Sequence, residues 1–261
     1  MLRKELQDAG DLLIPRECLV CGRKLLDYER HLCIYCEADL PLTYYWTNPS
    51  NPMSDKLNAL IQRDLEKSLD SGDYIGGRRE YARAAALFFY RGDAGYRKIP
   101  QRVKYSGDYR AGQYYGNLLG DFLVSSGSFN DVDIVMPVPL HWTRRWSRGY
   151  NQAEIIATGI AERLGTCLRS DILMRRRKTG TQTRLGVEAK AINVENAFAV
   201  RSGVLSGEGL TYGNGRPPHI LIVDDVFTTG ATIASCCSAV YKYFGNELRI
   251  SAATLGFVSP D

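Results

Sequence analysis

The sequence predicts an α/β fold built on a mostly parallel sheet, with a small cysteine-rich module in front of it. Residues 219–223 are consecutively apolar apart from the first, and residues 133–139, apolar after Asp133, form a second run that ends at prolines. Such runs are typical of strands that are buried on both faces, as in parallel sheets. Helix-like periodicity precedes and follows both runs. Four cysteines are grouped near the N-terminus: Cys18, Cys21, Cys33 and Cys36.

These cysteines form two Cys-x-x-Cys pairs separated by eleven residues. Each pair can direct two thiolates at one cation, and two pairs complete a tetrahedral site, so we expect structural zinc. Four protein ligands leave no open coordination position, so we expect no zinc catalysis. Redox-active dithiols or plain buried cysteines remain the alternatives. His31, between the pairs, is expected to be a solvated loop residue.

Length and composition are those of a globular protein that can bury a full domain and a small module. The chain has 261 residues, 44% hydrophobic and 24% charged. Seven cysteines, an odd number, fit a reducing compartment better than a disulfide framework. No apolar run approaches the length of a membrane span, and the N-terminus lacks a signal-peptide core. We therefore expect a cytoplasmic protein without membrane insertion.

Charge is unevenly distributed along the chain. The net formal charge is +4 overall, but residues 141–190 carry eleven basic and four acidic side chains, a net of +7. Residues 1–44 carry six basic and eight acidic side chains, a net of −2. The concentration of positive charge in the C-terminal part favours an acidic ligand there.

Taken in chain order, the pattern divides the sequence into three parts. Residues 1–44 form the zinc-ribbon module, 45–80 a helical connector or hood, and 81–261 the main domain. The connector contains a helix that Ser54 is expected to cap. The remaining elements expected are helices over 2–14, 99–105, 110–124 and 152–164 and strands over 84–90, 133–139, 171–174 and 248–257, with another strand after 191.

The strand over 219–223 carries the most specific signal. Asp224 and Asp225 follow it directly, at the edge of the sheet where open α/β folds bind ligands. A loop of hydroxyls and glycine then leads into a helix, and the free amides of a helix N-terminus hold anions. The loop residues are Thr228, Thr229, Gly230, Ala231 and Thr232. The two acids can accept hydrogen bonds from a sugar diol or face a bound cation, and the loop beside them can hold a phosphate. Together they predict a phosphorylated sugar as the ligand.

Competing motifs are absent from this stretch. The chain has no Gly-x-x-x-x-Gly-Lys-Ser/Thr loop and no Gly-x-Gly-x-x-Gly after this strand. A receiver-type acidic pocket opens its domain with a similar strand, but only 36 residues follow Asp225, too few to build that domain.

Basic loops follow two of the other strands. Arg144, Arg148 and Gly149 lie after the strand that ends at prolines, where arginine forks and close backbone approach suit pyrophosphate oxygens. A solvated basic loop is the alternative interpretation. Residues 175–185 are also basic and punctuated by glycine, which suits either a mobile lid over an acidic substrate or a disordered or nucleic-acid-contacting loop.

Residues 223–232, Val-Asp-Asp-Val-Phe-Thr-Thr-Gly-Ala-Thr, resemble the binding motif of type I phosphoribosyltransferases for phosphoribosyl pyrophosphate (PRPP). The resemblance implies the fold of that superfamily and PRPP binding together with Mg²⁺. It assigns the ribose hydroxyls to Asp224 and Asp225, which in an enzyme would be catalytic, and the 5′-phosphate to the loop at 228–232. It places the basic loop after the second strand at the pyrophosphate.

A narrower resemblance covers nearly the whole chain. The cysteine module, Pro137-Val138-Pro139-Leu140 and Arg148-Gly149-Tyr150-Asn151-Gln152 together resemble the ComF family of competence-associated, phosphoribosyltransferase-like proteins, linked to DNA uptake. Lys104 before Tyr105 matches a Leu-Lys-Phe/Tyr position of that family, with Val103 in place of the leucine. The resemblance implies that Lys104 is a catalytic candidate that stabilises the leaving pyrophosphate.

Three functional interpretations stay open at this point. The first is PRPP-dependent transfer to a nucleobase, as in nucleotide salvage, for which no general base and no acceptor can be named. The second is an accessory factor of the DNA-uptake machinery that binds single-stranded DNA through the basic stretch 141–190 and its exposed aromatic residues. The third is a sensor in which PRPP acts as a regulatory ligand without turnover.

Overall fold

The computed structural model describes residues 16–72, 76–91, 95–105, 107–140, 149–176, 197–203 and 216–259. The expected helix over 2–14, most of the basic loop after residue 140 and most of the basic stretch after residue 176 lie outside these ranges.

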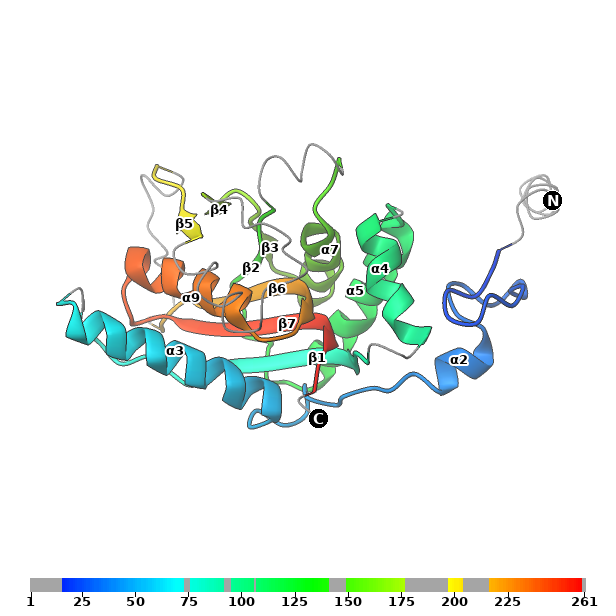
Figure 1. Cartoon of the computed structure of the whole chain (residues 1–261), viewed down its shortest axis with the longest axis horizontal. Coiled ribbons are helices and arrows are strands. Elements are labelled where there is room, and N and C mark those ends of the chain that lie inside the picture. Colours follow the sequence, from blue (N-terminus) through cyan, green and yellow to red (C-terminus); the bar gives the residue numbers. More distant parts are fainter. Residues whose placement is uncertain are drawn as a thin grey trace, which may run out of the picture.

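A five-stranded sheet forms the centre of the molecule, in the order β1-β7-β6-β2-β3 (Figure 1). Its strands are β1 (Arg83–Phe89), β2 (Ile134–Pro137), β3 (Cys167–Leu168), β6 (His219–Phe227) and β7 (Arg249–Phe257). All four neighbouring pairs run parallel. The predicted α/β class with a mostly parallel sheet is therefore confirmed, and the strand that carries the two acids, β6, lies at the centre of the sheet.

Helices cover both faces of this sheet (Figure 1). On one face lie α3 (Pro52–Asp70) and α9 (Ala231–Phe244), and on the other α4 (Lys98–Tyr105), α5 (Tyr109–Ser125) and α7 (Gln152–Leu164). Alternate residues of each strand enter opposite cores, so Ile220 and Ile222 pack toward α9 while Leu221 and Val223 pack toward α7. Burial on both faces explains the continuous apolar run in the sequence.

Helix α3 begins earlier than the sequence suggested. Asn51 is its N-cap, since its side chain accepts hydrogen bonds from the amides of Met53 and Ser54 at 3.0 Å each, and Pro52 occupies the first turn. The expected cap, Ser54, instead accepts a hydrogen bond from the amide of Ala84 in β1 at 2.9 Å. Its hydroxyl thus joins the helix to the sheet edge rather than starting the helix.

Two smaller parts complete the fold. Strands β4 (Leu173–Arg175) and β5 (Phe198–Val200) pair antiparallel as a separate ribbon beside α9. The cysteine module ends in the short helix α2 (Ile34–Ala38), and its buried Leu19 and Leu25 belong to the same apolar cluster as Ile99 and Val103 of α4. The division at 44 and 80 stays a prediction. Within the described ranges, no helix combines the length and apolarity that a membrane span needs.

Candidate functional site

The two acids lie on strand β6, just beyond the end of its neighbour β2. Val223 of β6 pairs with Pro137, the last residue of β2. On the other side, Asp224 still pairs with Thr254 of β7, and the strand continues to Phe227. The strand is therefore longer than the sequence suggested, but its last residues have lost their neighbour on one side. That step in the sheet opens the space next to both carboxylates.

Both acids are held in place by local hydrogen bonds. The amide of Asp225 donates to Oδ1 of Asp224 at 2.9 Å, and the amide of Val226 donates to Oδ1 of Asp225 at 2.9 Å. Burial, together with the nearby negative charge of Asp225, raises the pKa of Asp224 well above its usual range. A cation or a hydrogen-bond donor brought to this pair lowers that pKa again, so ligand binding and proton release are linked at Asp224.

The anion cradle forms directly after these acids. Gly230 is the N-cap of α9 and has a φ of 81°, a left-handed conformation that favours glycine. The amide of Ala231 donates to Oγ1 of Thr229 at 3.4 Å, and Ala231 and Thr232 begin the helix. The first turn of this 14-residue helix presents amides with no partner in the helix itself, which favours an anion. Thr228, at the outer end of the loop, is exposed.

A pocket of about 310 Å³ joins the acids to the cradle. Its walls come from β6, the loop, α4, α7 and the ribbon, and its lining residues are Tyr90, Lys104, Val138, Leu140, Gln152, Arg175, Asp224, Asp225, Val226, Thr228 and Thr232. Nζ of Lys104 lies 3.7 Å from Oδ2 of Asp225. The structure thus brings Lys104 to the acid pair, although more than a hundred residues separate them in the sequence.

Three further polar side chains line this pocket that the sequence analysis did not assign to the site: Tyr90, Gln152 and Arg175. The guanidinium group of Arg175 lies 5.1 Å from the ring centroid of Phe198 on the paired strand β5, a stacked position that fixes its direction. No local sequence motif marks Arg175 or Phe198, because their contact depends on the pairing of β4 with β5. The sequence pointed to Arg175 only as the first residue of the basic stretch 175–185, for which a lid was one interpretation.

The predicted pyrophosphate loop is described only at its end. Gly149 has a φ of 77°, as expected for a glycine that shapes a turn, and Asn151 then caps α7. The side chain of Asn151 also donates to the carbonyl of Val138 at 3.0 Å, so the start of α7 is fixed against the chain that leaves β2. Arg144 and Arg148 lie outside the described residues.

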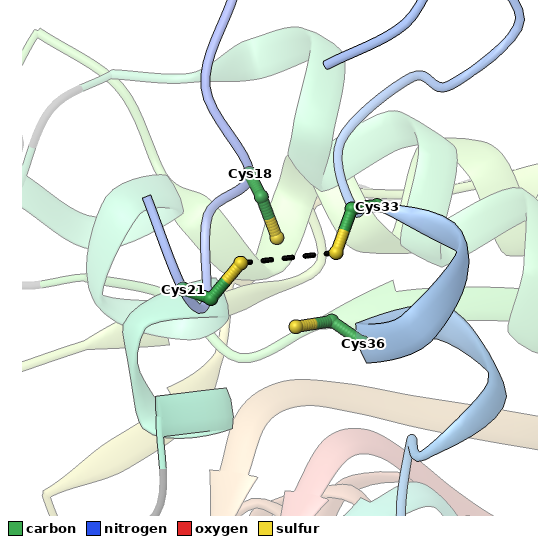
Figure 2. A group of neighbouring side chains, drawn as sticks. All are labelled: Cys18, Cys21, Cys33 and Cys36. Carbon is green, nitrogen blue, oxygen red and sulfur yellow. Dashed lines mark hydrogen bonds between the residues drawn. The ribbon is translucent and has the colours of Figure 1, made fainter. Parts of the chain in front are cut away.

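The four cysteines of the N-terminal module form one cluster. Their sulfur atoms all lie within 4.8 Å of one another and point toward a common centre (Figure 2). Cys21 Sγ and Cys33 Sγ are 3.7 Å apart. Tetrahedral zinc with Zn–S bonds of about 2.3 Å requires sulfur atoms about 3.8 Å apart, so the cluster fits a metal such as zinc. Burial alone would raise the pKa of the Cys18 thiol. Hydrogen bonds from the backbone of Cys21 and Cys33 outweigh this effect and lower the pKa of Cys18 to about 7. Cys18 is thereby closer to the thiolate form in which cysteine binds metal.

A Ser–His–Asp arrangement at the opposite end of the sheet is structural. His219 Nδ1 is 2.9 Å from Oδ1 of Asp131, and its Nε2 is 2.7 Å from Oγ of Ser251. Both His219 and Ser251 are only 1% exposed. A hydroxyl buried in this way within paired strands cannot reach a substrate, so the group satisfies buried polar atoms at the amino ends of β6 and β7.

The structure therefore brings together paired carboxylates at a strand end, the free amides of a helix N-terminus and a nearby lysine. No family model matches the chain. The chain is 35% identical over 123 residues to "DNA utilization protein YhgH" of Salmonella typhi, covering 47% of this chain and 46% of that protein. It is 30% identical over 118 residues to "Competence protein F" of Haemophilus influenzae, covering 45% and 48%. It is 29% identical over 132 residues to "Competence protein ComFC" of Streptococcus pneumoniae, covering 51% and 50%.

The matched region spans about half the length of these curated relatives. These similarities agree with the resemblance to the ComF family that the motifs of the sequence indicated.

Proposed function

We propose that this chain is a PRPP-binding, phosphoribosyltransferase-like protein of the ComF type that acts in DNA uptake. One observation carries the PRPP part of the proposal: Asp224 and Asp225 share a pocket with Thr228 and Thr232 of the cradle. A ribose diol needs hydrogen-bond acceptors and a 5′-phosphate needs free amides, and this pocket offers both side by side. The DNA-uptake part rests on the names of the relatives.

In this proposal each group of the site has one task. Asp224 and Asp225 accept hydrogen bonds from the ribose hydroxyls, and the loop at 228–232 holds the 5′-phosphate. Lys104, Arg144 and Arg148 balance the charge of the pyrophosphate. Carboxylate and phosphate oxygens are suitable ligands for Mg²⁺. When bound, Mg²⁺ would supply further positive charge at the pyrophosphate oxygens. Catalysis by such a site depends on positioning and charge stabilisation.

Isothermal titration calorimetry of the full chain with PRPP and Mg²⁺ tests the binding. Heat that saturates at one PRPP per chain is expected, and it should disappear in an Asp225→Asn variant. Absence of heat with the wild-type protein would reject the proposal. Pyrophosphate release from PRPP across a panel of nucleobases then separates a transferase from a sensor, because a sensor binds PRPP and releases no pyrophosphate with any base.

Single-stranded DNA binding is the second candidate. The names of the relatives and the net charge of +7 over residues 141–190 favour it. Fluorescence anisotropy with a labelled single strand is expected to give an affinity that falls steeply with salt concentration. Affinity that is absent, or independent of salt, would reject this candidate. Addition of PRPP to the same assay shows whether the two ligands compete.

For the cysteine module we propose structural zinc. One zinc ion per chain by mass spectrometry of the purified protein is the expected result, and a metal-free preparation that retains full stability would contradict it.

A further inference from the structure

The anion cradle has no positive side chain of its own. Residues 226–233, which form the loop and the first turn of α9, contain no lysine, arginine or histidine, and two carboxylates precede them. A phosphate monoester carries roughly 1.5 to 2 negative charges at neutral pH. Two acids precede these amides and hydroxyls, so a cation from another part of the chain would strengthen phosphate binding there.

Lys56, in the second turn of α3, lies next to the start of this loop. Its Nζ donates a hydrogen bond to the carbonyl oxygen of Thr228 at 2.9 Å, across 172 residues of sequence. The same ammonium group lies 6.0 Å from the ring centroid of Phe227. Lys56 therefore contacts the backbone at the start of the cradle. An ammonium group has three N–H donors, so one hydrogen bond to Thr228 leaves donors for a phosphate oxygen.

Helix α3 packs against the cradle at a second point, one turn after Lys56. A Cβ atom placed on Gly230 would lie 3.0 Å from Cδ1 of Leu60 and 2.4 Å from Cζ of Phe227. Residues 56 and 60 lie on the same face of the helix. The face of α3 that carries Lys56 is thus the face that touches the loop.

The position of α3 is itself fixed to the sheet. Nδ2 of Asn51 donates to the carbonyl of Ala84 at 2.9 Å, and Nδ2 of Asn58 donates to the carbonyl of Ala82 at 2.8 Å. With the bond from the amide of Ala84 to Ser54, these contacts attach the N-cap and the first two turns of α3 to β1 and to Ala82 just before it. Lys56 therefore projects from a rigid element, which preorganises its charge for a ligand.

We infer that Lys56 is the phosphate-binding cation of this site and that it selects phosphorylated over unphosphorylated ribose ligands. The inference rests on the proposed function, because it assigns the cradle to a 5′-phosphate. It adds that the segment before the main domain, and not only the motif at 223–232, supplies part of the binding site.

The test compares Lys56→Gln with Lys56→Arg, and with Lys242→Gln as a matched control. Lys242 is exposed in the last turn of α9, the helix whose first turn belongs to the cradle. Ribose 5-phosphate and PRPP are titrated into each variant at several salt concentrations, and melting temperatures are recorded. Lys56→Gln is expected to weaken both ligands about tenfold or more, with a shallower salt dependence, while Lys56→Arg and Lys242→Gln stay within about threefold of wild type.

Each other outcome has a definite meaning. Equal affinities of wild type and Lys56→Gln for ribose 5-phosphate would overturn the role of Lys56 and leave PRPP binding intact. Loss of affinity with an unchanged salt dependence, together with a lowered melting temperature, would show that Lys56 only supports the loop, and this would also overturn the inference. Ribose 5-phosphate binding that depends on Lys56 without any PRPP binding would support the inference and reject the proposed function. Failure of the wild type to bind either ligand would reject both.

Discussion

The ammonium group of Lys104 lies 3.7 Å from Oδ2 of Asp225, so helix α4 and strand β6 meet at the rim of the ligand pocket. The side chain of Asp225 is 11% exposed and that of Lys104 is 34% exposed, so water screens the pair only in part. A pyrophosphate that enters the pocket can replace Asp225 as the partner of Lys104, and a cation can replace Lys104 as the partner of Asp225. In the proposed PRPP complex, Lys104 neutralises the phosphate oxygens while Asp225 accepts hydrogen bonds from the ribose hydroxyls.

Lys104→Gln removes the positive charge of this pair. PRPP affinity is expected to fall about tenfold, since charge-assisted hydrogen bonds to phosphate are the strong ones. The free energy of unfolding should change by less than about 1 kcal/mol, because a partly exposed ion pair contributes little. Calorimetry and urea unfolding measure the two quantities. Arg102→Gln, exposed on the same helix, is the control and should bind as wild type does; equal affinity of Lys104→Gln would remove Lys104 from the site.

Those parts of the site that lie in one continuous stretch could be predicted from the sequence. The acids and the cradle are separated by two residues, and the cysteine pairs have a spacing that specifies a ligand set, so local order alone indicated them. The two-sided burial of β6 followed from its apolar run for the same reason. Local patterns of this kind survive folding because each occupies a single element or turn.

The remaining parts depend on tertiary contacts that no spacing records. Lys56 reaches Thr228 across 172 residues, and Arg175 reaches the pocket only through the pairing of β4 with β5. The start of α3 was misplaced by three residues because Asn51 and Ser54 are both good caps, and only the packing of Ser54 against β1 decides between them.

Asp224→Asn should stabilise the fold and abolish PRPP binding. Burial and the neighbouring carboxylate raise the pKa of Asp224, so the folded protein holds this proton above the pH at which the unfolded chain releases it. The wild type therefore loses stability as pH rises from the ordinary carboxyl range, near 4, through the raised pKa, and asparagine removes that loss. The melting temperature of the variant is expected to exceed that of the wild type by about 2 °C or more at pH 8, and the difference should vanish near pH 4.

A difference that is constant with pH, measured by differential scanning calorimetry from pH 4 to 8, would contradict this account of Asp224. Asp121→Asn, on the exposed part of α5, serves as the control and should show no such trend.

Gly230→Ala should damage the cradle. The φ of 81° disfavours any side chain at this position, and the new Cβ would lie 2.4 Å from Cζ of Phe227. A loss of more than about 2 kcal/mol in the free energy of unfolding is expected from backbone strain and overpacking together. Gly127→Ala is the matched control, because its φ is 70° but a Cβ there meets nothing within 4 Å. Equal losses in the two variants, measured by urea unfolding, would show that contact of the loop with Phe227 and Leu60 is unimportant.

Removal of metal from the cysteine module should loosen helix α4 as well as the module. Nζ of Lys98 donates to the carbonyl of Val20 at 2.7 Å, and Val20 lies between the first two cysteines. A Cβ on Gly95 would lie 2.8 Å from Cγ1 of Val20, so the chain entering α4 packs tightly on the same turn. In the proposed zinc site the metal holds the four cysteines together, so its loss is expected to free this turn and with it the first residues of α4.

Cys33→Ser, which replaces a ligand that is 1% exposed, is therefore expected to abolish metal binding and to raise amide hydrogen exchange over residues 95–105 by at least about tenfold. PRPP affinity should fall in parallel, because Lys104 projects from the end of that helix. Cys167→Ser changes an exposed cysteine of β3 outside the cluster and should leave the metal content, the exchange of α4 and the affinity unchanged. A Cys33→Ser protein that loses its metal but keeps the exchange rates of α4 would show that the module and the PRPP site are mechanically independent.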